Sequence, residues 1–243
     1  AWWWPAEPTG RGGDVLVLVD QDQVLAGFGA GFDAAWRRTH PTAPFHPRER
    51  SRTYWIQDDY GMQWAAQILQ VMTAPGFFRD LPVLPGAVAG MQGLLADGHD
   101  VRICTAPVQD YRHCVREKYE WVEEHLGHEW TTRMILTRDK TLVAGDVLLD
   151  DRPTVPGALT PAWDHLLFRA PYNADVPGRH VDWVDYREVL AEVEEARTRR
   201  GVLLAPRRAP RPVRTAVPAP VPAAAGRVDL APTGRQQICL VGR

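Results

Sequence analysis

A short apolar run followed at once by two aspartates constrains this chain more than any other feature. The run from Val15 to Val19 leads directly into Asp20-Gln21-Asp22. A β-branched apolar run of this length, bounded by polar residues, predicts a strand that is buried on both faces. Such strands belong to parallel sheets covered by helices, and ligands bind beyond their carboxyl ends. We therefore expect an α/β protein whose functional site includes these two carboxylates.

The rest of the chain alternates between strand-like and helix-like segments. Strands are predicted at 101–104, 133–136, 147–149 and 165–168, and helices at 27–38, 86–97, 110–126 and 184–200. This alternation predicts βαβ units and a Rossmann-like parallel sheet flanked by helices. A further aromatic segment, with Ser51 as the expected helix cap, lies between the first strand and the next unit. An insertion at this point is well placed to form a small helical cap over the site.

These segments divide the chain into four expected parts. They are a loose leader at 1–13, a core at 14–32 and 85–200, a helical cap at 33–84 and a tail at 201–243. The tail is rich in proline, alanine and arginine and has too few apolar residues for a core, which predicts disorder. A basic tether for RNA or another anionic surface is the alternative for the tail.

Charge and cysteine content limit the classes of partner. The net charge is −2, and the segment from Ala205 onward holds seven arginines and one aspartate, which leaves about −8 for the rest. This balance argues against nucleic-acid binding by the core. No apolar run approaches the ~20 residues of a membrane span. Three cysteines form no disulfide framework, which favours a reducing compartment, and we expect a cytoplasmic protein.

Polar side chains converge on the carboxyl ends of the predicted strands. They are Asp20, Asp22, Thr105, Lys140, Asp150 and Asp151. Carboxylate oxygens, water and phosphate are the ligands that Mg²⁺ prefers. One carboxylate can attack phosphorus and form an aspartyl-phosphate, while a second can act as general acid and base. A lysine and a hydroxyl can hold the phosphoryl oxygens. The set therefore predicts phosphoryl transfer.

The order of these residues resembles the four-part signature of haloacid dehalogenase-like phosphohydrolases. Longer segments are similar to the 5′(3′)-deoxyribonucleotidases of that superfamily: VLVDQDQVLAGF, APGFFRDLPVLPGA, ICTAP, C-x-x-EKY-x-WVE, ILTRDKTLV and LLDDRP. The resemblance covers about residues 14–195. It implies a Rossmann-like core, a small helical cap and Mg²⁺-dependent removal of phosphate from nucleoside monophosphates.

The resemblance implies a role for each carboxylate. Asp20 would be the nucleophile and a magnesium ligand. Asp22 would be the general acid/base and would offer its backbone carbonyl to the metal. Asp151 would complete the protein ligands of the metal, with Asp150 supporting it.

The resemblance also implies contacts with the phosphate and the nucleoside. The residues near the phosphate would be Thr105, Lys140, Lys118 and Arg138. For Lys118 and Arg138, a role as solvated charges is an equal alternative. The residues around the base and sugar would be Phe28, Tyr54, Trp55 and Ile56. A flat base gains from stacking on aromatic rings. Trp55 could instead belong to the hydrophobic core of the cap. For Trp64 and Ile68 we favour this core role over contact with the base.

Three positions depart from the family pattern. Gln23 stands where the family has glycine, Gly27 replaces an acidic residue, and Ala106 replaces a hydroxyl-bearing residue. Because the catalytic carboxylates, Thr105 and Lys140 all remain, we expect slower turnover or a changed substrate rather than an inactive site.

Together these observations predict a cytoplasmic 5′-nucleotidase of deoxyribonucleotide catabolism, with a homodimer as one expected assembly. Two alternatives remain open. The first is a phosphatase for another small phosphate ester, and the second is a catalytically weakened module that binds phosphate or nucleotide.

Overall fold

The structure is a computed structural model that describes residues 15–199. The expected leader at 1–13 and tail at 201–243 lie outside the described residues. Among the described helices, none is long and apolar enough to cross a membrane. Cys104 and Cys114 are buried free thiols, and burial raises the pKa of Cys104 to about 12.

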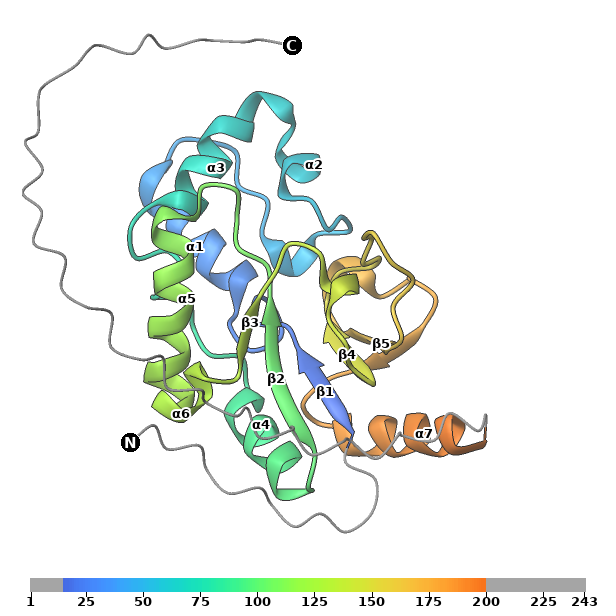
Figure 1. The fold of residues 1–243 in the computed structure, drawn as a ribbon. Helices are drawn as coiled ribbons and strands as arrows, with labels where there is room; N and C mark the ends of the chain where they lie inside the picture. The colour runs from blue at the N-terminus through green and yellow to red at the C-terminus, as the bar shows by residue number, and fades with distance from the viewer. Residues whose placement is uncertain (1–14, 200–243) are drawn as a thin grey trace, which may run out of the picture. The chain divides into compact units, whose positions relative to one another are not determined.

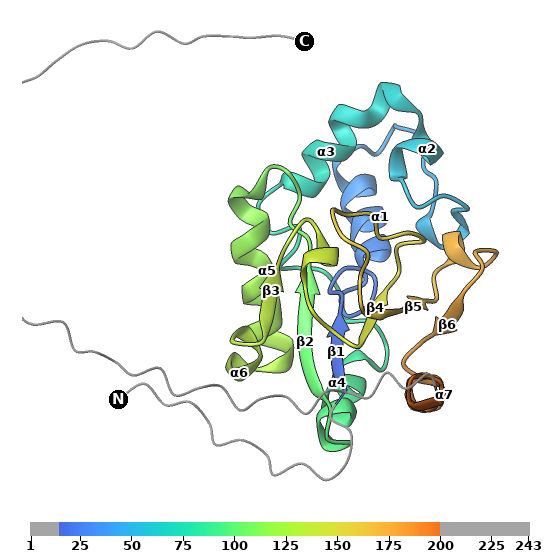
Figure 2. The same ribbon diagram turned by 45° about the vertical axis from the view of Figure 1, so that its right-hand side comes forward.

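Six parallel strands form one sheet in the order β3-β2-β1-β4-β5-β6 (Figure 2). Their bounds are β1 Leu16–Val19, β2 Asp100–Thr105, β3 Met134–Leu136, β4 Val147–Asp150, β5 Asp164–Phe168 and β6 Arg179–Val181. The strand predicted from the apolar run is β1, which pairs with β2 on one side and β4 on the other. Its residues Val17, Leu18 and Val19 are fully buried. The predicted parallel sheet is confirmed, and β1 is central in it.

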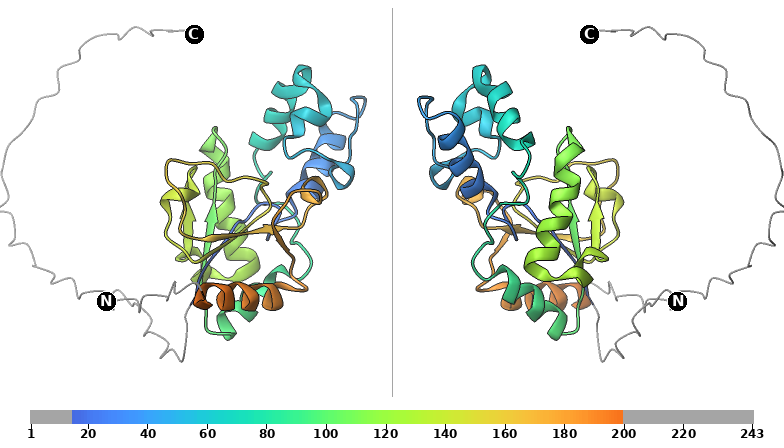
Figure 3. Two further views of the ribbon diagram at one scale, coloured as in Figure 1. Left: turned by 90° about the vertical axis from the view of Figure 1, so that its right-hand side faces the viewer. Right: turned by 90° about the vertical axis from the view of Figure 1, so that its left-hand side faces the viewer.

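Helices flank this sheet and extend beyond one end of it (Figure 1). They are α1 Phe28–Thr39, α2 Ile56–Tyr60, α3 Ala65–Thr73, α4 Ala87–Ala96, α5 Tyr111–Leu126, α6 His128–Thr131 and α7 Tyr186–Arg199. Figure 3 shows α2 and α3 gathered with α1 at the end of the sheet where β1 finishes. The helix α1 runs without a break across residue 32, where the sequence analysis divides core from cap.

The prediction that a helix starts at Ser51 is wrong. The structure has a 3₁₀ helix η1 at Arg48–Arg50, then a turn, then α2, a second 3₁₀ helix η2 at Met62–Trp64, and α3. Ser51 is buried in the turn, where its hydroxyl bonds to Asp59 instead of capping a helix. Gly61 separates α2 from η2 with a φ of +88°, a left-handed conformation that favours glycine.

Two segments connect the inserted helices to the sheet, and they contact each other. The Gly27 N–H donates to the Pro82 carbonyl at 2.6 Å, and Ala26 bridges to Val83. A Cβ on Gly27 would lie 3.2 Å from Pro82 Cγ and 3.3 Å from its carbonyl oxygen. This close approach explains why glycine suits position 27, where the family pattern has a larger residue.

The returning segment is also held by α5. The buried Glu117 carboxylate accepts hydrogen bonds from the Gly76 N–H at 2.6 Å and the Phe78 N–H at 3.1 Å. Trp121 donates from its indole to the Leu81 carbonyl at 2.8 Å. Because α5 packs in the core, these bonds fix the path by which the chain returns from the inserted helices.

Candidate active site

The first part of the site is the loop that follows β1. The Asp20 N–H donates to the Leu149 carbonyl at 2.9 Å, which extends the pairing of β1 with β4 by one residue. The Asp20 carboxylate accepts the next N–H, that of Gln21, at 2.8 Å. Only 9% of Asp20 is exposed. The strand thus delivers a buried, oriented carboxylate at its carboxyl end.

Gln23 lies in the same loop with a left-handed φ of +57°, which is costly for a residue with a side chain. Its side-chain oxygen accepts the Gly29 N–H at 2.8 Å, in the first turn of α1. The first N–H groups of a helix have no partner within the helix, so this bond stabilises α1. The conformation that glycine would permit is therefore kept, and the glutamine side chain connects the loop to α1.

Three buried carboxylates meet where β1 and β4 end. One oxygen from each of Asp20, Asp150 and Asp151 can be chosen so that all lie within 4.8 Å of one another. Burial, and then the neighbouring Asp150 and Asp20 charges, raise the pKa of Asp151 well above its usual value. Burial also raises the pKa of Asp150. Asp150 and Asp151 therefore resist ionisation here unless a positive charge is close by.

Lys140 supplies one such charge. Its Nζ atom lies 2.9 Å from Asp20 Oδ1 and 2.5 Å from Asp150 Oδ2. Burial acts to lower the pKa of Lys140, but the two carboxylates outweigh it and raise the pKa. Lys140 begins the 3₁₀ helix η3, Lys140–Leu142, whose first turn is fixed by the Asp139 carboxylate. The lysine is therefore charged and held in place.

Lys118 from α5 supplies the second charge. It is fully buried, with Nζ 2.7 Å from Asp22 Oδ1, 3.0 Å from Thr105 Oγ1 and 4.9 Å from the centre of the Phe78 ring. About a quarter of the Asp22 side chain is exposed. Burial still raises the pKa of Asp22, against the lowering effect of Lys118.

These residues together leave an excess of negative charge. Within residues 15–199, the four carboxylates of Asp20, Asp22, Asp150 and Asp151 share two lysine partners, Lys118 and Lys140. A divalent cation would balance this excess, and hard oxygen ligands suit Mg²⁺. The side-chain oxygens that lie together come from Asp20, Asp150 and Asp151, whereas the Asp22 carboxylate pairs with Lys118. The donor set fits a hard divalent metal.

Of the four residues assigned to the phosphate, three meet in this site. Thr105 ends β2 and contacts Lys118, while Lys140 bridges two of the carboxylates. Arg138 is exposed in the connection after β3, and no hydrogen bond or ion pair joins it to another site residue in the described part of the chain. Its assignment to the phosphate stays a prediction.

The residues assigned to the base differ in their exposure and in their contacts. Tyr54 and Trp55 precede α2, and 51% of Trp55 is exposed. The Arg152 guanidinium lies over both rings, at 5.6 Å and 5.4 Å from their centres. Ile56, in contrast, is buried in the core. Half-buried Phe28 packs on Phe77, with the ring centres 5.5 Å apart.

Two residues of the site were missed by the sequence analysis. Arg152 follows the Asp150-Asp151 pair inside the quoted LLDDRP segment, so its motif was the available signal. Tyr172, in the 3₁₀ helix η4 at Pro171–Asn173, donates a hydrogen bond to Asp151 Oδ2. No motif in the sequence marks Tyr172, because its place depends on how the chain turns after β5.

The chain resembles known proteins along most of its described length. Residues 14–196 match the family described as 5′ nucleotidase, deoxy (pyrimidine), cytosolic type C protein. A putative 5′(3′)-deoxyribonucleotidase of Bordetella pertussis is 49% identical over 178 residues, covering 73% of this chain and 96% of that one. The human 5′(3′)-deoxyribonucleotidase, cytosolic type, is 44% identical over 188 residues, covering 72% and 93%.

A solved structure supports the fold alone. A haloacid dehalogenase-family hydrolase from Deinococcus radiodurans, solved with phosphate and sodium, superposes with a TM-score of 0.50 at 15% identity. The match covers 74% of this chain and 96% of that one.

Proposed function

The chain belongs to the cytosolic type C family of 5′(3′)-deoxyribonucleotidases, which are haloacid dehalogenase-like phosphoric monoester hydrolases, and from this premise we propose its substrate and mechanism. It removes phosphate from deoxyribonucleoside monophosphates with the help of Mg²⁺, through an aspartyl-phosphate on Asp20. The observation that carries the proposal is the meeting of the Asp20, Asp150 and Asp151 oxygens beside Lys140.

The metal would be held by Asp20, Asp151 and the backbone carbonyl of Asp22, with Asp150 in support. When bound, Mg²⁺ neutralises charge on the phosphoryl oxygens and orients them for in-line attack. The excess negative charge and the raised pKa values of Asp150 and Asp151 support this assignment, because a cation would favour their ionised forms.

In the first step, Asp20 attacks phosphorus and the bond to the nucleoside oxygen breaks. Asp22 gives its proton to that leaving oxygen. The raised pKa of Asp22 supports this role, since the carboxyl must hold a proton at the start. Lys140 and Thr105 hold the phosphoryl oxygens as charge develops on them.

In the second step, water attacks the phosphorus of the aspartyl-phosphate. The Asp22 carboxylate takes a proton from that water, and the bond between Asp20 and phosphorus breaks. Inorganic phosphate leaves with Asp20 ionised and Asp22 protonated again. Lys118, 2.7 Å from Asp22, stabilises the carboxylate form that Asp22 adopts between the two steps.

The nucleoside would contact Tyr54, Trp55 and Phe28. The half-exposed Trp55 ring offers a face for the base, and stacking contributes roughly 1–3 kcal/mol per base. The buried position of Ile56 supports a role in the cap core instead of direct contact with the base.

The human relative is described as the cytosolic type, which supports a cytoplasmic location for this protein. The homodimer and an RNA-binding tail stay predictions.

The direct test is phosphate release from a panel of nucleoside and deoxynucleoside monophosphates and sugar phosphates, with Mg²⁺ or with EDTA. We expect Mg²⁺-dependent release that favours dUMP or dTMP. Release from sugar phosphates alone would support phosphatase activity but would contradict nucleotides as the substrates. No release from any ester by folded protein would favour the binding-module alternative.

A further inference from the structure

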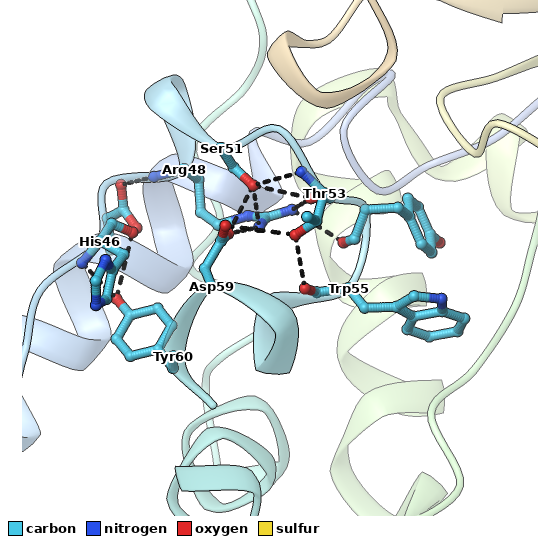
Figure 4. A network of polar contacts seen from close by, with 9 residues as sticks. His46, Arg48, Ser51, Thr53, Trp55, Asp59 and Tyr60 are labelled. Atoms are coloured by element: carbon cyan, nitrogen blue, oxygen red, sulfur yellow. Dashed lines mark hydrogen bonds and ion pairs between the residues drawn. The ribbon is translucent and has the colours of Figure 1, made fainter. Parts of the chain in front are cut away.

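One buried arginine organises the turn that leads to Tyr54. Arg48 is 6% exposed, and its Nη2 donates to the carbonyls of Thr53 at 3.2 Å and Tyr54 at 3.0 Å (Figure 4). Its Nη1 donates to Ser51 Oγ at 2.9 Å and to Asp59 Oδ2 at 2.7 Å. The planar guanidinium makes four directed bonds that an ammonium group could not reproduce. Arg48 therefore fixes the backbone on which the base-facing rings are carried.

The same guanidinium also contacts an aromatic ring from a distant segment of the chain. It lies over the ring of Tyr172, 5.1 Å from the ring centre, and the Tyr54 ring meets Tyr172 edge-on at 5.7 Å. A cation over an aromatic face is favourable, and more so away from water. Tyr172 comes from η4, after β5, so Arg48 joins two segments that are far apart in the sequence.

Tyr172 in turn orients a carboxylate of the acidic cluster. Its hydroxyl donates to Asp151 Oδ2. The neighbouring Asn173 is fully buried and donates from Nδ2 to the carbonyls of Asp151 and Phe168, both at 2.8 Å. Tyr172 thus stands on a rigid segment, with its ring against Arg48 and its hydroxyl on Asp151.

We propose that Arg48 and Tyr172 are positioning residues that couple the nucleoside-facing loop to the metal ligand Asp151. A nucleoside on Trp55 and Tyr54 stabilises the loop that Arg48 holds, and this keeps the Tyr172 ring and hydroxyl in place. The oriented Asp151 then binds the divalent metal more tightly. Coupling of this kind is reciprocal, so the metal also tightens nucleoside binding. The inference rests on the proposed function for the identity of its two ligands.

The cap offers a matched control. Tyr60 has a buried ring, and its hydroxyl bonds to the backbone of His46 at 3.3 Å and 3.4 Å (Figure 4). Those contacts stay within the helical insertion and do not reach the acidic cluster. Tyr60→Phe therefore removes a comparable hydroxyl without touching the proposed connection.

The first experiment measures Mn²⁺ binding to the full chain by electron paramagnetic resonance, without substrate. Tyr172→Phe keeps the ring contacts and removes the bond to Asp151. Loss of a partner that orients a metal ligand weakens binding on the order of 10- to 100-fold, and we expect this for Tyr172→Phe and no change for Tyr60→Phe. Equal Mn²⁺ affinity in Tyr172→Phe and the unmodified protein would overturn the proposal.

The second experiment repeats the Mn²⁺ titration with saturating deoxyuridine, which has no phosphate to bind the metal directly. We expect about fivefold tighter Mn²⁺ binding in the unmodified protein and in Tyr60→Phe. The ratio of the Mn²⁺ affinities with and without deoxyuridine should fall to about one in Tyr172→Phe and in Arg48→Lys. Arg48→Lys keeps the positive charge but loses the planar guanidinium and its directed hydrogen bonds. If thermal denaturation shows that Arg48→Lys does not fold, Ser51→Ala is used, because it removes one Arg48 partner.

The outcomes separate this inference from the proposed function. Protein that hydrolyses dUMP but binds Mn²⁺ equally with and without deoxyuridine would overturn the coupling alone. Protein that releases no phosphate from dUMP would count against the proposed function. A fivefold ratio that survives in Tyr172→Phe and Arg48→Lys would show that the coupling runs through other residues.

Discussion

Lys118 Nζ lies 2.7 Å from Asp22 Oδ1, and none of the lysine side chain is exposed. The lysine comes from the middle of α5 and the aspartate from the loop after β1, so helix and loop meet through a buried ion pair. From the sequence, a solvated surface charge is an equal interpretation of Lys118. The structure contradicts it, because the side chain is fully buried. The pair places a fixed positive charge beside the proposed general acid/base.

Lys118→Met should move the pH dependence of turnover. Lys118 lowers the pKa of Asp22, so removing it raises that pKa further. Asp22 must hold a proton in the first step and be ionised in the second, so both the acid limb and the basic limb of the kcat profile should shift about 1–3 pH units upward. Steady-state kinetics between pH 5 and 9 measures the shift. An unchanged acid limb would contradict a role for Asp22 as base.

Asp22→Asn should separate the two chemical steps. With dUMP, kcat should fall by roughly 10²–10⁴, because the leaving oxygen receives no proton. With p-nitrophenyl phosphate, the leaving group needs no proton, and the variant should still give a burst of one p-nitrophenol per site. Steady release after the burst should be slow, since water attack lacks its base. Stopped-flow absorbance measures both phases, and equal loss of burst and steady rate would contradict the assignment.

Trp55→Ala should raise KM for dUMP roughly tenfold and change kcat less, because base stacking acts on binding. The ring is half exposed, so the melting temperature should change little. Trp64→Ala is the comparison, since Trp64 packs on Trp36 with ring centres 5.7 Å apart. That variant should lower the melting temperature by several degrees with a smaller effect on KM. Equal KM values for Trp55→Ala and the unmodified protein would remove Trp55 from the base site.

Gln23→Gly should be more stable than Gln23→Ala. Both variants lose the bond to the Gly29 N–H. The left-handed conformation of residue 23 is unfavourable for alanine but not for glycine. The difference in free energy of unfolding should be about 1 kcal/mol, which denaturant titration can resolve. Equal stabilities would mean that the loop relaxes away from φ +57° when the glutamine is removed.

The sequence predicts the sheet because its signals are local. The apolar run at 15–19 is too short and too β-branched for a helix, and the alternation that follows limits the topology. The site is predictable for a related reason: Asp20 directly follows β1, while Thr105 ends β2 and Asp150 ends β4. The carboxyl ends of these parallel strands meet at one edge of the sheet.

Features that depend on long-range contacts were not predictable. β6 has three residues, Arg179–Val181, and no apolar alternation to mark it. Arg48 looks the same in sequence as the neighbouring Arg50 and Arg52, yet it alone of the three is buried with four directed bonds. Ser51 has the residue type of a helix cap, but the buried guanidinium of Arg48 and the Asp59 carboxylate bind its hydroxyl instead.

The central claim is that Asp20 forms a bond to phosphorus, and phosphate release from dUMP by Asp20→Asn tests it most directly. The unmodified protein and the variant are compared at equal concentration with Mg²⁺ and with EDTA, after thermal denaturation shows that both are folded. We predict Mg²⁺-dependent release by the unmodified protein and only background release by the variant, because an amide is not a useful nucleophile. Comparable Mg²⁺-dependent release by Asp20→Asn would contradict the account.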